Sequence, residues 1–262
     1  MASLLAPMSR RFRVANRPFR VRTEDGVTLV GARLGSAPVA LVFCHGFLGW
    51  HRKHRVVRFC EALAERFTVY AFDFRGHGAS GGHSTLGDLE VHDVDAVVRL
   101  ARADGHATVV TAGGSMGGVA AVRHAALIGG VDAVVAISTP AGWDGHASQA
   151  VRLMSRITTT DRGRRVARSL GVRVAESWSD PESPEEVAGR ISPVPLIVMH
   201  GRDDHFFDEE QAWRLYRAAR EPKRLLLAAP FGHAEDGFSP RAAEVVASRV
   251  YAVLGERPRP KP

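Results

Sequence analysis

Two patterns of hydrophobic and polar positions follow one another along the chain. Near its start, residues 19–22 and 27–30 alternate between apolar and polar side chains around a Glu-Asp-Gly turn, which predicts an antiparallel hairpin. Downstream, short continuous apolar runs replace this alternation, as is typical of strands buried on both faces of a parallel sheet. The runs cover residues 39–43, 68–72, 108–111, 133–137, 196–199 and 224–228.

Segments with helical periodicity separate the apolar runs. They lie at about residues 51–66, 88–103, 115–128, 208–220 and 240–253. Strands that alternate with helices in this way form βαβ units. We therefore predict an α/β fold with a mostly parallel central sheet, the antiparallel hairpin at its N-terminal end, and helices on both faces.

The alternation is interrupted between about residues 140 and 190, where no strand pattern occurs. Apolar residues recur there at helical spacing, namely Ala150, Val151, Met154 and Ile157. Further on, Ser183 followed by Pro184 is typical of the start of a helix. We interpret residues 140–190 as a small helical insertion, which leaves a single domain over residues 1–262.

The composition is that of an ordinary globular protein, with 45% hydrophobic and 24% charged residues in a chain of 262. The formal net charge is +7, and all but three of the 35 basic residues are arginine. These arginines are spread along the whole chain, without a basic helix, an aromatic stacking ladder or zinc-finger spacing. The charge therefore does not predict a nucleic-acid partner.

The two cysteines, Cys44 and Cys60, are too few for a disulfide framework and have no metal-ligand spacing. We predict neither a metal ion nor another cofactor. No apolar run reaches the roughly 18 residues of a membrane-spanning helix, and the basic start of the chain lacks the apolar segment of an export signal. The expectation is a cytoplasmic protein that acts on a small molecule.

The clearest chemical motif is GGSMGG at residues 113–118, which contains Ser115. It directly follows the apolar run 108–111 and directly precedes a helical pattern. A G-x-S-x-G motif between a strand and a helix holds its serine in a strained turn, with the hydroxyl exposed at the carboxyl edge of the sheet. We therefore predict that Ser115 is a nucleophile.

A serine nucleophile needs a base within hydrogen-bond distance and a carboxylate that orients the base. His233 follows the apolar run 224–228, and Asp203 and Asp204 follow the run 196–199. Since the carboxyl ends of parallel strands meet at one edge of the sheet, these side chains are expected beside the serine. The chain order Ser, Asp, His is one of the known orders for this arrangement.

With two further motifs, these residues resemble the α/β-hydrolase family over about residues 19–254. The stretch HGFLG at residues 45–49 is similar to the HG-x-x-G oxyanion loop of the family, and DFRGHGAS at residues 73–80 is similar to its D-x-R-G-H-G-x-S turn. The resemblance implies the α/β-hydrolase fold, in which the insertion at 140–190 forms a cap. It also implies a cofactor-independent serine esterase, thioesterase or lysophospholipase.

The resemblance also implies roles for individual residues. Ser115 is expected to be the nucleophile, His233 the general base and acid, and Asp204 the group that orients His233. The backbone N–H groups of Phe47 and Met116 are expected to form the oxyanion hole.

Two other aspartates compete with Asp204 for the acid position. The family pattern G-x-x-D favours Asp204 over its neighbour Asp203, which would then face solvent or pair with an arginine. Asp144, after the run 133–137, falls at a position that some family members use.

The insertion is expected to determine which substrate binds. The residues that we predict to contact substrate are His45, Trp143, Val151, Met154 and Trp178. Packing of the cap against the body is an alternative role for the apolar ones, and hydrogen bonding that shapes its loop is an alternative role for His45. Two basic clusters are also expected near the site, at residues 51–55 and at Arg162, Arg164, Arg165 and Arg168. They favour an anionic substrate, such as a carboxylated ester or a carrier-linked thioester, or form a solvated basic face.

The predicted reaction is hydrolysis of a carboxylic ester or thioester through an acyl-enzyme. The same scaffold also supports acyltransferases, perhydrolases and carbon–carbon hydrolases. A lyase that forms no acyl-enzyme, or a protein that only binds a small molecule, is a further alternative, because fold does not determine function.

Overall fold

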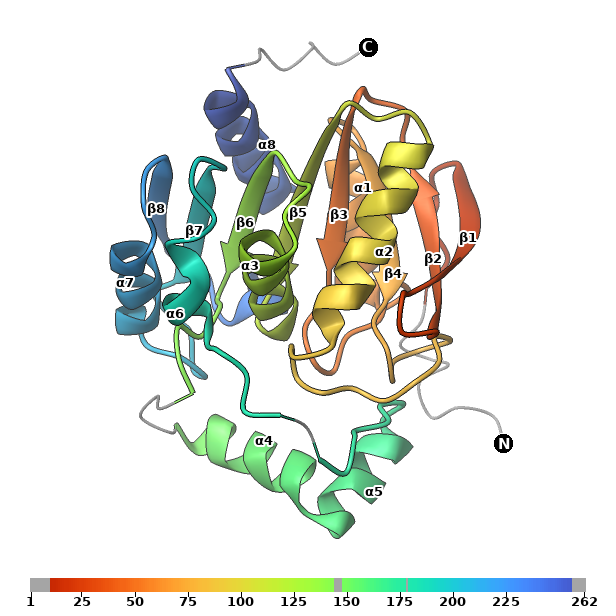
Figure 1. Ribbon diagram of the computed structural model, residues 1–262, viewed down its shortest axis with the longest axis vertical. Coiled ribbons are helices and arrows are strands. Elements are labelled where there is room, and N and C mark those ends of the chain that lie inside the picture. Colours follow the sequence, from red (N-terminus) through yellow and green to blue (C-terminus); the bar gives the residue numbers. More distant parts are fainter. Residues whose placement is uncertain (1–9, 144–147, 178, 256–262) are drawn as a thin grey trace.

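The computed structural model describes residues 10–143, 148–177 and 179–255, and its strands form one eight-stranded sheet (Figure 1). The strands are β1 (Asn16–Arg22), β2 (Thr28–Leu34), β3 (Val39–Cys44), β4 (Thr68–Asp73), β5 (Thr108–Gly114), β6 (Ala133–Ile137), β7 (Leu196–Gly201) and β8 (Lys223–Ala228). Their spatial order is β1-β2-β4-β3-β5-β6-β7-β8. The pairs β1/β2 and β2/β4 are antiparallel, and every later pair is parallel. The predicted sheet with an N-terminal antiparallel hairpin is confirmed.

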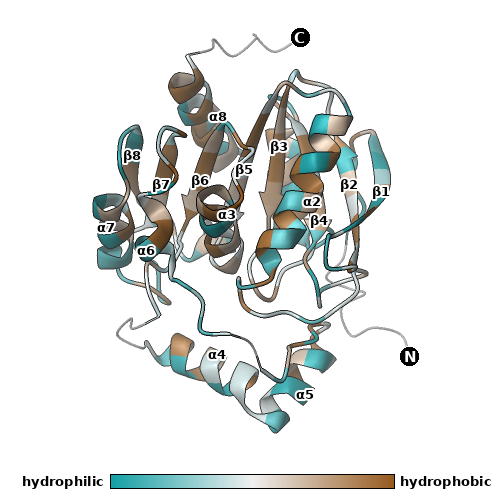
Figure 2. Ribbon diagram, in the orientation of Figure 1, coloured by the Kyte–Doolittle hydropathy of each residue, from teal (hydrophilic) through white to brown (hydrophobic). Residues whose placement is uncertain are grey.

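Each predicted apolar run lies within one of the parallel strands. Every residue of β3, β4, β6 and β7 is buried, because helices cover both faces of the sheet. β8 is only half-buried at the edge of the sheet, and β1 at the other edge is largely exposed. Figure 2 shows this difference as hydrophobic central strands and a partly hydrophilic β1.

The helices form two layers. α1 (His54–Leu63) and α8 (Pro240–Leu254) pack together on one face, whereas α2 (Glu90–Ala103), α3 (Met116–Leu127) and α7 (Glu209–Ala218) cover the other (Figure 1). Between the sheet and the first layer, the Phe59 ring stacks on Phe238 at 4.5 Å and meets Phe43 at 5.5 Å. The five helices correspond to the five segments predicted from periodicity.

The insertion contains α4 (Gln149–Thr159), α5 (Asp161–Ser169) and the short α6 (Pro184–Ala188). α4 and α5 lie across one end of the sheet, away from the body, and α6 packs against α3 and α7 (Figure 1). The predicted start of α6 is confirmed, because Ser183 and Glu186 form a capping box. α5 has no counterpart among the segments predicted from sequence.

No helix within the described ranges is both long enough and apolar enough to cross a lipid bilayer.

Candidate active site

Ser115 lies in a sharp turn between β5 and α3, where its backbone has φ 54° and ψ −122°. A non-glycine residue in this region is strained by about 1–3 kcal/mol, so the surrounding structure must hold it there. Two neighbouring glycines allow the turn to pack tightly. A Cβ atom at Gly113 would lie 2.2 Å from the Gly117 carbonyl oxygen, and one at Gly117 would lie 2.1 Å from the Cys44 carbonyl oxygen.

His233 and Asp204 are joined by hydrogen bonds. Nδ1 of His233 lies 2.8 Å from Oδ2 and 3.0 Å from Oδ1 of Asp204. The Asp204 side chain is almost completely buried, and its Oδ1 also accepts the backbone N–H groups of Phe206 (2.8 Å) and Phe207 (3.1 Å). Burial alone would raise the pKa of Asp204, but the hydrogen bonds from His233 and from the two N–H groups outweigh it and hold this pKa below its usual range. Asp204 is therefore a permanent anion beside the imidazole at neutral pH.

The neighbouring Asp203 has a different environment. It is exposed, and among the described residues its side chain accepts only a long hydrogen bond of 3.3 Å, from the backbone N–H of Phe231 to Oδ2. The structure thus brings Asp204 to His233 and leaves Asp203 at the surface. Asp144, the third candidate, lies outside the described residues.

Two aromatic rings hold the imidazole of His233 in place. The Phe206 ring lies 4.4 Å from it, tilted by 32°, and the Phe207 ring lies 5.5 Å away in an edge-on arrangement. Their backbone N–H groups bind Asp204, so the same two residues position both members of the pair. Neither phenylalanine is among the site residues predicted from the sequence.

The backbone N–H groups of Phe47 and Met116 donate to no other group in the described part of the chain. Met116 is the first residue of α3, where N–H groups have no partner within the helix. Phe47 lies in the loop after β3, and Nε2 of His77 donates to its carbonyl oxygen. Both N–H groups are thus available as donors, and their role as an oxyanion hole stays a prediction.

His45 lies outside the cavity lining, unlike the substrate-contacting position predicted for it. Its side chain is completely buried, with Nε2 accepting the backbone N–H of Phe74 (3.0 Å) and Nδ1 donating to the Gly46 carbonyl oxygen (2.7 Å). Burial lowers the pKa of His45 to about 3, so the ring is neutral. Both ring nitrogens are occupied in joining the oxyanion loop to the turn after β4.

Ser115 and His233 line one cavity of about 640 Å³, which lies between the carboxyl ends of the strands and the cap. Of the predicted substrate contacts, Trp143, Val151 and Met154 also line it, whereas Trp178 lies outside the described residues. Other apolar lining residues come from loops of the body: Phe47, Leu48, Leu86, Pro140, Phe206 and Phe207. The cavity is largely apolar.

Two cations of the first basic cluster are paired with acidic side chains. Lys53 reaches the cavity, but its Nζ lies 2.8 Å from Oε2 of Glu235 and donates to the Leu48 carbonyl oxygen at 3.1 Å. Arg55 is paired with Asp236. Three arginines of the second cluster line a separate hollow beside the cavity.

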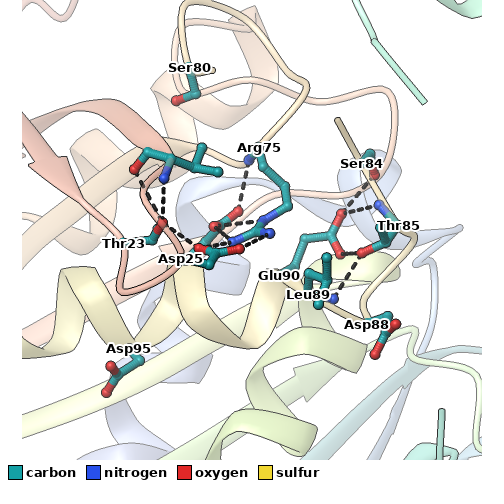
Figure 3. Close-up of polar contacts among 12 residues, drawn as sticks. Thr23, Asp25, Arg75, Ser80, Ser84, Thr85, Asp88, Leu89, Glu90 and Asp95 are labelled. Carbon is teal, nitrogen blue, oxygen red and sulfur yellow. Dashed lines mark hydrogen bonds and ion pairs between the residues drawn. The ribbon is translucent and has the colours of Figure 1, made fainter. Parts of the chain in front are cut away.

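Glu90 shapes one wall of the cavity and was not identified from sequence. Its fully buried carboxylate accepts hydrogen bonds from the Ser84 hydroxyl (2.7 Å), the Thr85 N–H and hydroxyl (2.9 and 2.7 Å) and the Gly87 N–H (2.9 Å), as Figure 3 shows for Ser84 and Thr85. These bonds hold the loop in which Leu86, at φ 60°, meets the cavity. No local sequence pattern marks this contact.

We expect Glu90→Gln to lower the free energy of unfolding by about 1–3 kcal/mol, measured by urea denaturation. Each carboxylate oxygen accepts one backbone N–H, so the amide nitrogen of Gln would leave one N–H without an acceptor. Glu210→Gln is the control, because Glu210 is exposed and paired only with Arg217 on the surface. Its cost is expected below about 0.5 kcal/mol. Equal losses in both variants would contradict the role of Glu90.

Comparison with known proteins supports this architecture. A model of the Alpha/beta hydrolase family matches residues 41–259. Uncharacterized protein YfhR of Escherichia coli O157:H7 is 30% identical over 238 residues, which cover 85% of this chain and 74% of YfhR. YfhR of Salmonella typhi is 27% identical over 244 residues, which cover 85% of this chain and 75% of that protein.

Two solved structures share the fold. The Pyrococcus furiosus esterase Pf2001 has a TM-score of 0.72 at 23% identity, with 92% of each chain covered. The alpha/beta hydrolase GrgF from Penicillium sp. sh18 has a TM-score of 0.70 at 18% identity, covering 92% of this chain and 98% of GrgF. These likenesses confirm the fold class predicted from the sequence motifs.

Proposed function

Because the chain belongs to the alpha/beta hydrolase family, we propose that it hydrolyses a carboxylic ester or thioester through an acyl-enzyme on Ser115. Family membership by itself supports hydrolase activity, and the site supports the choice of bond and nucleophile. One observation carries the proposal. The strained Ser115 lines the same cavity as His233, and Nδ1 of His233 is hydrogen-bonded to Asp204.

The position of the proton on the His233 ring follows from its partner. Since an ionised carboxylate only accepts hydrogen bonds, Nδ1 must carry the proton that Asp204 binds, and Nε2 of the neutral ring is left as a base. In the proposed mechanism, Nε2 takes the proton of the Ser115 hydroxyl while Oγ attacks the carbonyl carbon of the substrate. His233 then gives this proton to the departing alcohol or thiol.

The tetrahedral intermediate places a negative charge on the former carbonyl oxygen. In the proposal, the N–H groups of Phe47 and Met116 bind this oxyanion, each contributing roughly 3–4 kcal/mol to stabilisation of the transition state. A water molecule, activated by the same imidazole, attacks the acyl-enzyme and releases the acid. No cofactor is needed for either half of the reaction.

An active-site-directed probe tests the nucleophile directly. We expect a fluorophosphonate to label the protein with 1:1 stoichiometry, and peptide mass spectrometry to locate the label on Ser115. Hydrolysis of p-nitrophenyl acetate should disappear in parallel with labelling. Absence of labelling, or a label on another residue, would overturn the proposal.

The cap side of the cavity is proposed to bind the acyl group. Met154 lies on the inner side of α4 and lines the cavity, whereas its neighbour Leu153 is 59% exposed on the outer side. We expect Met154→Trp to lower kcat/KM for p-nitrophenyl octanoate about tenfold and to change that for the acetate less than twofold, because a larger side chain shortens the acyl pocket. Leu153→Trp is the matched control and should alter neither value. A loss of the same size for both esters would exclude an acyl pocket at Met154.

A further inference from the structure

A second hollow, of about 600 Å³, lies beside the active-site cavity. We refer to it as the arginine hollow. Its lining residues are His83, Asp161, Arg164, Arg165, Arg168, Val174, Ala175 and Glu176. Three of the four arginines of the second basic cluster therefore line a concave surface rather than an open face.

The linings of the two hollows come from neighbouring positions along the chain, although they have no residue in common. Thr158 and Thr159, at the end of α4, line the active-site cavity, and Asp161 at the start of α5 lines the arginine hollow. On the body side, Leu86 lines the cavity and His83, three residues earlier, lines the hollow. A substrate chain that reaches from the cavity into the arginine hollow would pass between these neighbouring residues.

The hollow holds positive charge that the protein itself does not neutralise. Arg164 is committed to the protein, because it pairs with Asp161 and donates to the Thr159 carbonyl oxygen at 3.0 Å. Arg165 and Arg168 are exposed, with no hydrogen-bond or ion-pair partner in the described part of the chain. The lining thus combines these two guanidinium groups with the carboxylate of Glu176, which has no ion-pair partner among the described residues.

The wall that carries His83 is held to the cap by main-chain hydrogen bonds. The N–H of Ser84 donates to the Arg173 carbonyl oxygen (2.7 Å), and the N–H of Ala175 donates to the Ser84 carbonyl oxygen (2.9 Å). Nε of Arg173 adds a bond to the Gly82 carbonyl oxygen at 3.2 Å. The hollow is consequently built from fixed backbone on one side and from α5 on the other.

We propose that the arginine hollow binds a phosphate group at the far end of the substrate. Two guanidinium groups provide several N–H donors in fixed planes, which match the multiple oxygens of a phosphate better than the two of a carboxylate. The imidazole of His83 adds a further hydrogen-bonding group. This inference rests on the proposed function in assigning the phosphate to a substrate, and it makes the enzyme selective for esters with a phosphorylated tail.

Binding of inorganic pyrophosphate, measured by isothermal titration calorimetry, tests the hollow without reference to catalysis. Arg165→Ala/Arg168→Ala is expected to weaken binding at least tenfold. The matched control is Arg156→Ala/Arg162→Ala, which removes the same charge from exposed cap positions outside the hollow and should change Kd less than twofold. Undetectable binding to the unaltered protein, or an equal loss in the control, would overturn the proposal.

Kinetics test the connection to the substrate. We compare p-nitrophenyl alkanoates with equally long esters that carry a terminal phosphate, over a series of chain lengths. The phosphorylated ester should have at least tenfold higher kcat/KM once its chain is long enough to reach the arginine hollow. Arg165→Ala/Arg168→Ala should abolish this preference, while the neutral ester keeps its rate. No preference at any length would overturn the substrate assignment, whereas loss of hydrolysis for every ester would overturn the proposed function and leave the calorimetric test intact.

A lipid surface is the competing source of phosphate. Binding to phosphatidylglycerol vesicles that falls in Arg165→Ala/Arg168→Ala, with unchanged pyrophosphate binding, would assign these arginines to a membrane and overturn the subsite.

Discussion

Replacement of Ser115 by alanine is expected to lower kcat for p-nitrophenyl acetate by about 10⁴–10⁶-fold, with little change in KM. The hydroxyl of Ser115 is the group that forms the proposed acyl-enzyme. Without it, the proposed oxyanion hole supports only a small residual rate. Alanine keeps the Cβ atom and therefore the same backbone strain at φ 54°. The fold is expected to be unaffected, so the loss reports on chemistry.

Ser155→Ala is the matched control, because Ser155 lines the same cavity from the cap but lies outside the turn between β5 and α3. Its kcat is expected to stay within about threefold of the unaltered enzyme. Thermal melting of both variants checks the fold. If Ser115→Ala keeps more than a tenth of the activity, the acyl-enzyme mechanism is wrong.

The sheet could be predicted from the sequence because its strands are buried on both faces. An uninterrupted apolar run such as residues 133–137 has few alternatives, and β6 has these same bounds. The strands that end at the active site extend beyond their predicted runs. β7 continues to Gly201, since the polar His200 is buried by tertiary contacts that hydropathy does not reveal.

The cap was harder to predict because little of it is buried. α4 has an inner apolar side, and Val151 and Met154 indicate it correctly. α5 consists mainly of arginine and small residues, with Ala167 as its one buried residue, so no apolar stripe marks it. Local hydrogen bonds define this helix instead, including its cap by the Thr160 hydroxyl.

The residues of the candidate site also differ in how far the sequence predicts them. Ser115, His233 and Asp204 could be predicted as candidates because each follows a strand, and the parallel sheet brings these strand ends to one edge. Glu90 could not, since its role depends on hydrogen bonds to a loop whose conformation is not written in a local pattern. His45 shows the converse: a motif predicts that the residue is present near the site, but only packing reveals that its ring is enclosed.

The sequence does not reveal which basic residues are paired with acidic ones. The cluster at residues 51–55 follows the oxyanion loop and suggested an anion site, yet Lys53 and Arg55 are paired with acidic residues of the loop after β8. The loop supplies Glu235 and Asp236, two and three residues after His233. These pairs hold the loop that carries His233, whereas Arg165 and Arg168 of α5 have no ion-pair partner in the described part of the chain.

Replacement of Asp204 by asparagine is expected to lower kcat about 10³–10⁴-fold, because it moves the ring proton of His233 from Nδ1 to Nε2. The N–H groups of Phe206 and Phe207 both donate to Oδ1, so the amide oxygen of Asn must occupy that position. Its NH₂ group then stands at the Oδ2 position, 2.8 Å from Nδ1 of His233. As a donor, it requires an unprotonated Nδ1 and moves the imidazole proton to Nε2, where the base is needed.

Asp203→Asn provides the matched control, since it makes the same chemical change one residue away on an exposed side chain. Asp203 accepts only the Phe231 N–H at 3.3 Å, so kcat should change less than threefold. Steady-state kinetics from pH 6 to 9 separate the effects, because a misplaced proton lowers kcat across the whole range while a shifted titration only moves the profile. A loss in Asp203→Asn as large as that in Asp204→Asn would show that the acid of the site is shared or lies elsewhere. The hydrogen bond between Asp204 and His233 would then not determine the tautomer of His233.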